Sequence, residues 1–217
     1  MSRLVARLAA ILAPVALLLP AAAHAEQLTV DDGVGDAKAV NFASVVSEAA
    51  EGEPLFLDAP AETSVDIVRT IVTHGKRLSL AVSFRDLAQT AEHSLDIRII
   101  TPEGRFNLMA AVSADGSAHA ELYPSRVVAV AGQGPFDIRP CRSVRARYDV
   151  DADLVTVSAP AKCVGAPRWV QVAVVASRLS VTPIGDGSVN LAGYGDDAFR
   201  GGLSERTRGR SPKVRRG

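Results

Sequence analysis

Aromatic, cysteine, histidine and lysine residues are all scarce in this chain of 217 residues. Aromatics make up 5% of it and are scattered along the chain, so a stack of rings for binding a flat ligand is not indicated. The four histidines form no HExxH zinc motif, and neither a GxSxG nucleophile turn nor a phosphate-binding glycine loop is present. Because these catalytic motifs are missing, we expect a protein that is not an enzyme.

Long hydrophobic runs are also missing, apart from one at the N-terminus. Residues 8–19 are apolar and follow Arg3 and Arg7, and small residues then lead up to Ala25, as in a signal-peptidase site. The run is shorter than the roughly 20 residues that a membrane-spanning helix needs. We therefore expect residues 1–25 to be a cleaved signal peptide with no transmembrane segment after it. The protein would be secreted, extracellular or associated with the cell envelope.

Charge is distributed unevenly, although the chain as a whole has 24 basic and 24 acidic residues. Residues 200–217 contain seven basic residues and one acidic residue, so this end is strongly positive and the rest of the chain is negative. The C-terminal part is also rich in glycine and poor in apolar residues, and residues 184–217 are predicted to form a disordered basic tail. Two alternatives stay open: the tail contacts an anionic cell-envelope polysaccharide or surface, or it folds back on the acidic body. Nucleic acid is not an expected partner of an exported protein with an acidic body.

The middle of the chain has the pattern of antiparallel strands. Residues 78–84 alternate between apolar and small polar side chains, the period of a half-buried strand. Further runs of this kind recur every 8 to 12 residues or so, separated by turn residues, and His74 is placed in one of these turns, exposed to solvent. We therefore predict an all-β fold with little helix, an antiparallel β-sandwich of jelly-roll-like type spanning residues 26–183. Residues 39–51 fit a helix or an extended segment equally well.

The two cysteines, Cys141 and Cys163, stand at the far ends of two strand-like runs. Their spacing excludes a CxxC redox pair, and export favours a stable disulfide bond. The aspartates between the two runs do not follow a calcium-binding EF-hand loop, because Leu154 and Pro160 occupy the positions that need Gly and Glu. The stretch is therefore interpreted as a hairpin stapled by a disulfide, with a solvated acidic turn.

An acidic, glycine-rich loop near the mature N-terminus is the best candidate for a metal site. Asp31, Asp32 and Asp36 lie in TVDDGVGDA, and glycines there allow backbone carbonyls to turn inward, as in oxygen-rich Ca²⁺ sites. Asp66 is predicted to add a ligand if the strand that contains it pairs nearby, and Asp58 and Glu62 are further candidates. The alternative is an acidic entry loop that binds nothing. Apart from this Ca²⁺, no cofactor is predicted.

The single tryptophan, Trp169, has two interpretations. It is either a platform for a sugar ring or other flat ligand, or a core residue packed against the disulfide, and the shortage of aromatics favours the core.

Three stretches occur in a recognisable order: DDGVGDA, then VDIVRTIVTHGKRLSLAVSFRDL, then CVGAPRWVQV after the cysteine pair. In this order they resemble a group of uncharacterised secreted actinobacterial proteins. The strand order is similar to that of the lectin-like sandwiches in family 9 carbohydrate-binding modules and DOMON domains, over residues 28–177. The resemblance implies the fold and carries over no binding residue.

The leading functional hypothesis is a secreted, non-catalytic binding module of unknown ligand, with a carbohydrate or cell-envelope polymer as one candidate and Ca²⁺ assistance as an option. The alternative is a structural or interaction protein without a specific small ligand, and an enzyme of unrecognised type ranks third.

Overall fold

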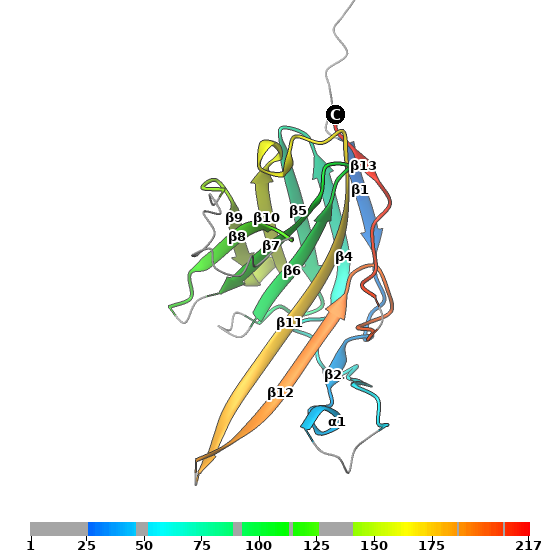
Figure 1. The fold of residues 1–217 in the computed structure, drawn as a ribbon. Coiled ribbons are helices and arrows are strands. Elements are labelled where there is room, and N and C mark those ends of the chain that lie inside the picture. Colours follow the sequence, from blue (N-terminus) through cyan, green and yellow to red (C-terminus); the bar gives the residue numbers. More distant parts are fainter. Residues whose placement is uncertain are drawn as a thin grey trace, which may run out of the picture.

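The computed structural model describes residues 26–46, 52–88, 93–112, 115–125, 141–185, 187–205 and 207–217. These residues form two antiparallel β-sheets packed face to face (Figure 1). The predicted all-β sandwich is confirmed. The predicted signal peptide, residues 1–25, lies outside the described residues. Of the stretch 39–51, residues 47–51 lie outside the described residues; the described part contains both of the expected elements, the end of a short strand followed by the one-turn helix α1 (Ala43–Val46).

The first sheet has five strands in the order β1-β4-β5-β10-β9. Its strands are β1 (Glu26–Asp31), β4 (Ile67–His74), β5 (Arg77–Phe84), β10 (Leu154–Pro160) and β9 (Arg145–Asp149).

The second sheet runs in the order β3-β2-β12-β11-β6-β7-β8, and a short eighth strand pairs with the start of β11. Its strands are β2 (Lys38–Val40), β3 (Phe56–Asp58), β6 (His93–Ile100), β7 (Arg105–Val112), β8 (Ala118–Pro124), β11 (Trp169–Gly185), β12 (Ser188–Asp197) and β13 (Val214–Arg215).

The hydrophobic core lies between the two sheets and follows from the alternation in the sequence. Leu80 and Val82 on β5, and Ile97 and Ile99 on β6, are all at most 1% exposed and belong to one buried cluster. Each such side chain contributes about 1.5–3 kcal/mol when it is removed from water. The polar residues between them face outward, so each sheet has one apolar face.

The disulfide between Cys141 and Cys163 is present, with an S–S distance of 2.08 Å. It joins the segment before β9 to the short helical turn η3 (Ala161–Val164), which follows β10. β9 and β10 form an antiparallel hairpin whose turn contains η2 (Val150–Ala152). The predicted stapled hairpin with an acidic turn is therefore confirmed.

The C-terminal part differs from the predicted disordered tail starting at residue 184. β11 runs through to Gly185 and pairs with β12, and the chain then returns to pair again with the beginning of β11. The returning segment contacts the body through an ion pair of 2.7 Å between Arg208 and Asp96. Folding back on the body, one of the alternatives above, is thus what the structure has. Counting charge missed the strand pairing that orders this segment.

His74 is also not the exposed turn residue that was predicted. It is the last residue of β4 and is fully buried. Its Nε2 atom lies 3.0 Å from the carbonyl oxygen of Pro167, which it can contact as a donor. Burial lowers the pKa of His74, so its neutral form is favoured. The hairpin turn consists of the two following residues alone.

Candidate functional site

Five aspartates gather where the end of β1, the beginning of β4 and the end of β12 meet. Asp32 and Asp36 lie in the loop after β1, Asp66 directly precedes β4, and Asp196 and Asp197 end β12. These positions are brought together because β1 pairs with β4 and the end of β12 lies against the entry to β4. We call these five residues the acidic cluster.

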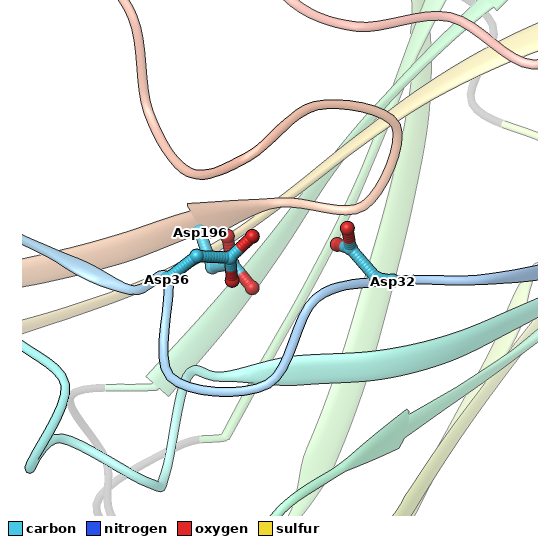
Figure 2. Close-up of side chains that lie close together, drawn as sticks. All are labelled: Asp32, Asp36 and Asp196. Carbon is cyan, nitrogen blue, oxygen red and sulfur yellow. The ribbon is translucent and has the colours of Figure 1, made fainter.

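Three members of the cluster converge on one point. Asp32, Asp36 and Asp196 each offer a carboxylate oxygen, and these atoms all lie within 4.8 Å of one another. Figure 2 shows the carboxylates of Asp36 and Asp196 side by side, with Asp32 at the opposite end of the loop after β1. The spacing suits oxygen atoms that share one cation.

Several carboxylate oxygens in the cluster are buried without a hydrogen-bond donor. Among the described residues, Oδ2 of Asp32, Oδ1 of Asp36 and Oδ1 of Asp66 have no partner, and Asp66 is fully buried. A buried carboxylate oxygen is costly unless it is paired. These unpaired oxygens are a second observation, independent of the clustering, that indicates a missing positive group.

Oxygens of Asp66 and Asp196 are held mainly by backbone donors, which keep these side chains in place. Asp196 accepts hydrogen bonds from the N–H groups of Ile67 (2.8 Å) and Asp197 (2.7 Å). Asp66 Oδ2 accepts one from Gly35 (2.8 Å) and lies 3.0 Å from the Nη1 atom of Arg85. The side chains are therefore oriented by the strands themselves, before any ligand is considered.

The returning C-terminal segment closes one side of the cluster. Asp197 accepts hydrogen bonds from the N–H groups of Phe199 (3.2 Å) and Gly209 (2.6 Å), which fixes both ends of the loop between them. Within this loop, Gly202 has φ +75°, and a Cβ atom there would lie 2.3 Å from the carbonyl oxygen of Asp36. Only glycine combines that backbone angle with so close an approach.

Burial and mutual repulsion raise the carboxyl pKa values in the cluster. The pKa of Asp32 rises to about 7, mainly through burial, and repulsion from Asp36, Asp197 and Asp66 adds to it. Burial raises the pKa of Asp196 to about 8, again with repulsion from its neighbours. For Asp36, Asp66 and Asp197 burial is likewise the main cause of a raised pKa. Without a cation, the cluster must therefore hold protons near neutral pH.

The sequence predicted part of this arrangement. Asp32 and Asp36 belong to the converging set, and Asp66 lies buried beside it. Asp31 does not belong to this set, because its carboxylate is exposed and pairs with Arg69 at 2.6 Å. The important residue that the prediction missed is Asp196, which no local pattern connects with a loop some 160 positions earlier.

The two further ligand candidates have other partners. Asp58 pairs with Lys38, and Glu62 forms an ion pair of 2.8 Å with Arg178. The first pair joins neighbouring strands β2 and β3 of the second sheet, and the second joins the loop before β4 to β11.

Trp169 is half-buried at the beginning of β11, and it is not an open platform. The ammonium group of Lys213 lies 4.2 Å from the centroid of its ring, within the range of a cation–π contact. A ligand that stacks on this face of the indole would first have to displace the lysine.

A shallow hollow of about 400 Å³ lies on the outer face of the first sheet. One cross-strand row of its lining consists of Thr73, Ser79, Ser158 and Arg145, which are paired in register across β4, β5, β10 and β9. Arg147 lies in the next row on the same edge strand. The surface thus presents hydroxyl groups beside the guanidinium group of Arg145, whereas that of Arg147 pairs with Asp149 at 2.8 Å; we call this surface the hydroxyl groove.

Fold and site together define an antiparallel β-sandwich with a converging acidic cluster at one end and the hydroxyl groove on one face. No family model, curated protein or solved structure matches the chain. The resemblance to secreted actinobacterial sandwiches therefore stays a prediction. In the described part of the chain, no helix has the length and apolar character required to cross a bilayer.

Proposed function

We propose that the protein is an exported, non-catalytic binding module whose acidic cluster holds a Ca²⁺ ion. The observation that carries this proposal is the convergence of Asp32, Asp36 and Asp196 within 4.8 Å, beside buried carboxylate oxygens that have no hydrogen-bond donor. A divalent cation would give these oxygens the positive partner that they lack.

The chemistry of the donor set favours Ca²⁺ over other common metals. The converging groups are all carboxylates, and hard oxygen donors suit Ca²⁺ or Mg²⁺ rather than Zn²⁺, which prefers nitrogen and sulfur. Mg²⁺ demands near-octahedral geometry and gives up its water reluctantly, whereas Ca²⁺ accepts irregular sets of ligands. Two of the three aspartates lie in a loop, which supports the more adaptable ion.

Such an ion would connect distant parts of the chain. Asp32 and Asp36 belong to the first loop, and Asp196 ends β12, which is followed by the returning segment. Binding would therefore stabilise the closure of the sandwich at this end. A role of this kind is structural, and it fits a module that works outside the cell, where Ca²⁺ is abundant.

The hydroxyl groove is the surface that we assign to the ligand. Serine and threonine hydroxyls can both donate and accept hydrogen bonds, and guanidinium groups attract carboxylates, sulfates and phosphates. A hydroxyl-rich anionic polymer, such as a cell-envelope polysaccharide, satisfies both kinds of donor. The hollow spans four paired strands, so it offers a rigid surface to an extended chain.

The cation is tested by titration calorimetry of the purified protein, stripped with a chelator and then titrated with CaCl₂ or MgCl₂. We expect one Ca²⁺ site with a Kd of about 10⁻⁴ to 10⁻³ M, the range of extracellular modules. Asp36→Asn should abolish the binding heat, since it removes a converging carboxylate. Asp151→Asn, an exposed aspartate in the β9–β10 turn, serves as the matched control and should bind normally. No Ca²⁺ binding by the unmodified protein at 10 mM, by the same range of affinities, would refute the proposal.

A second candidate function is that of an interaction protein without a small ligand. The observation that favours it is a protruding hairpin with exposed apolar side chains, described next.

A further inference from the structure

The last seven of the 17 residues of β11, and most of β12, extend beyond the sheet to which they belong. β6 pairs with β11 only as far as Arg178, and β2 pairs with β12 only at Tyr194 and Gly195. Beyond these points the two strands pair only with each other among the described residues. Figure 1 shows them projecting away from the rest of the sandwich. We call residues 179–185 and 187–193 the arm.

The apolar side chains of the arm lie on the opposite face of the sheet from the core. Within the sandwich, Val172, Val174 and Ala176 on β11 point inward and are fully buried. In the arm, Ser180 and Thr182 at even positions are polar, and Leu179 and Val181 at odd positions are apolar. The register with β12 does not shift before Pro183, so the strand has not slipped or bulged to cause this change. The hydrophobic pattern itself has changed face.

This face of the arm is an exposed apolar strip. Val181 pairs with Leu191 and Pro183 with Val189, so apolar side chains lie next to one another across the two strands. The large apolar residues of this face are 42–52% exposed: Leu179, Val181, Val189 and Leu191. A contiguous exposed patch of this kind usually marks an interaction site.

The composition of the arm narrows the choice of partner. Residues 179–193 contain one charged residue, Asp186, and no lysine, arginine, tryptophan or tyrosine. Segments that lie on membranes usually carry basic residues and interfacial aromatics, so a lipid surface is disfavoured. An uncharged apolar strip of this kind suits a second strip of the same composition.

We propose that the arm is a dimerisation element, in which the apolar strips of two copies of this chain pack face to face across a twofold axis. A twofold interface uses the same patch on both subunits, and a strip without charge does not repel its own copy. Residues such as Val181 and Leu191 would then be buried by the partner, as the core residues of the sandwich are buried by the opposite sheet. This proposal does not depend on the Ca²⁺ site or on the hydroxyl groove.

The test compares variants on the two faces of the arm by analytical ultracentrifugation, over concentrations from the micromolar to the submillimolar range. The unmodified protein should sediment as a dimer, and the double variant Val181→Lys with Leu191→Lys should sediment as a monomer. Thr182→Lys with Asn190→Lys changes a directly paired, exposed position on the polar face and should leave the dimer intact. Unchanged circular dichroism and thermal unfolding in both variants would show that the fold survives.

Two outcomes would overturn the proposal. An unmodified protein that stays monomeric throughout the range has no dimer to explain, and a dimer that survives both lysine substitutions on the apolar strip uses another surface. A crosslinking experiment adds an independent readout, because Val181→Cys should form a disulfide-linked dimer on mild oxidation, whereas Thr182→Cys should not. Co-sedimentation of a monomeric protein with phosphatidylcholine or phosphatidylglycerol vesicles would assign the strip to a lipid surface instead.

Discussion

Replacing Asp32 by Asn should stabilise the protein when Ca²⁺ is absent and weaken it, relative to the unmodified protein, when Ca²⁺ is present. Asn keeps an oxygen that can accept the hydrogen bond from the Gly33 N–H, which Asp32 Oδ1 accepts at 2.9 Å. It replaces the unpaired Oδ2 with an amide that can donate to the neighbouring carboxylates. The change therefore removes a negative charge and adds a donor where one is missing.

The size of the effect follows from the raised pKa of Asp32. A pKa raised from 3.8 to about 7 favours the protonated folded state, so its contribution to stability is complete below pH 4 and is lost as the pH rises through 7. At pH 7.4 the penalty for Asp32 is at most about 4 kcal/mol, and about 2 kcal/mol after allowing for solvent screening of this half-buried group. Asp32→Asn should then raise the melting temperature in a chelator by roughly 4–8 °C.

With Ca²⁺ present, the unmodified protein should become more stable than the Asp32→Asn variant. At a concentration of 100 times the Kd, the ion stabilises the unmodified protein by about 2.7 kcal/mol, whereas the variant lacks one of the converging carboxylates and should gain little. Differential scanning calorimetry at pH 7.4 and at pH 5, with Ca²⁺ and with a chelator, measures all four cases. The advantage of Asp32→Asn in the chelator should shrink at pH 5, because the carboxyl is then largely protonated in the folded state.

Asp151→Asn should behave like the unmodified protein in every condition, because this residue is exposed in the β9–β10 turn and is not a member of the acidic cluster. A variant at Asp32 that melts below the unmodified protein in the chelator would refute the reasoning, since repulsion would then not dominate at this position. If the unmodified protein has the same melting temperature with and without Ca²⁺, the acidic cluster does not bind the ion.

Three further predictions concern other parts of the molecule. Burial lowers the pKa of His93 to about 4, so its neutral form contributes stability above pH 6.5, and this contribution is lost as the pH falls toward 4. In urea unfolding, His93→Phe should reduce the loss of unfolding free energy between pH 6.5 and pH 4 by up to about 3 kcal/mol. Replacing Cys141 and Cys163 by Ser opens a loop with a sequence separation of 22, which should lower the free energy of unfolding in urea by about 3 kcal/mol. Reducing agents should then have no further effect on the stability of this variant. In affinity gel electrophoresis with alginate, Arg145→Ala should weaken binding several-fold, whereas the exposed Arg168→Ala outside the groove should not; equal retardation of both variants would argue against the hydroxyl groove.

The sandwich was predictable because its signals are local. The alternation over residues 78–84 is that of a single strand with one buried face, and it appears in the structure as β5 with every second residue buried. The staple between Cys141 and Cys163 followed from the spacing of the only two cysteines and the strand-like runs between them. Such patterns require no knowledge of distant residues.

The predicted boundary between the sandwich and a disordered C-terminal tail was wrong for a different reason. Prediction from net charge and glycine content averaged over residues 184–217 and so hid the alternation of Val189 and Leu191 with polar residues. The stretch Ile184-Gly185-Asp186-Gly187 is also a turn signal between two strand-like runs. A residue-by-residue search for hairpins could have found β12, and with it the ordered end of the chain.

The acidic cluster was only half predictable, because its second half depends on how the strands are ordered in space. A glycine-rich acidic loop indicates that oxygen ligands are available, but it cannot show whether their charge is compensated. The structure adds that Asp196 is brought to this loop by backbone hydrogen bonds from Ile67 and Asp197, and that Arg85 reaches the cluster at Asp66. Folding thus concentrates negative charge that the chain does not fully neutralise. That imbalance, rather than the acidic sequence alone, is the physical reason to expect a cation there.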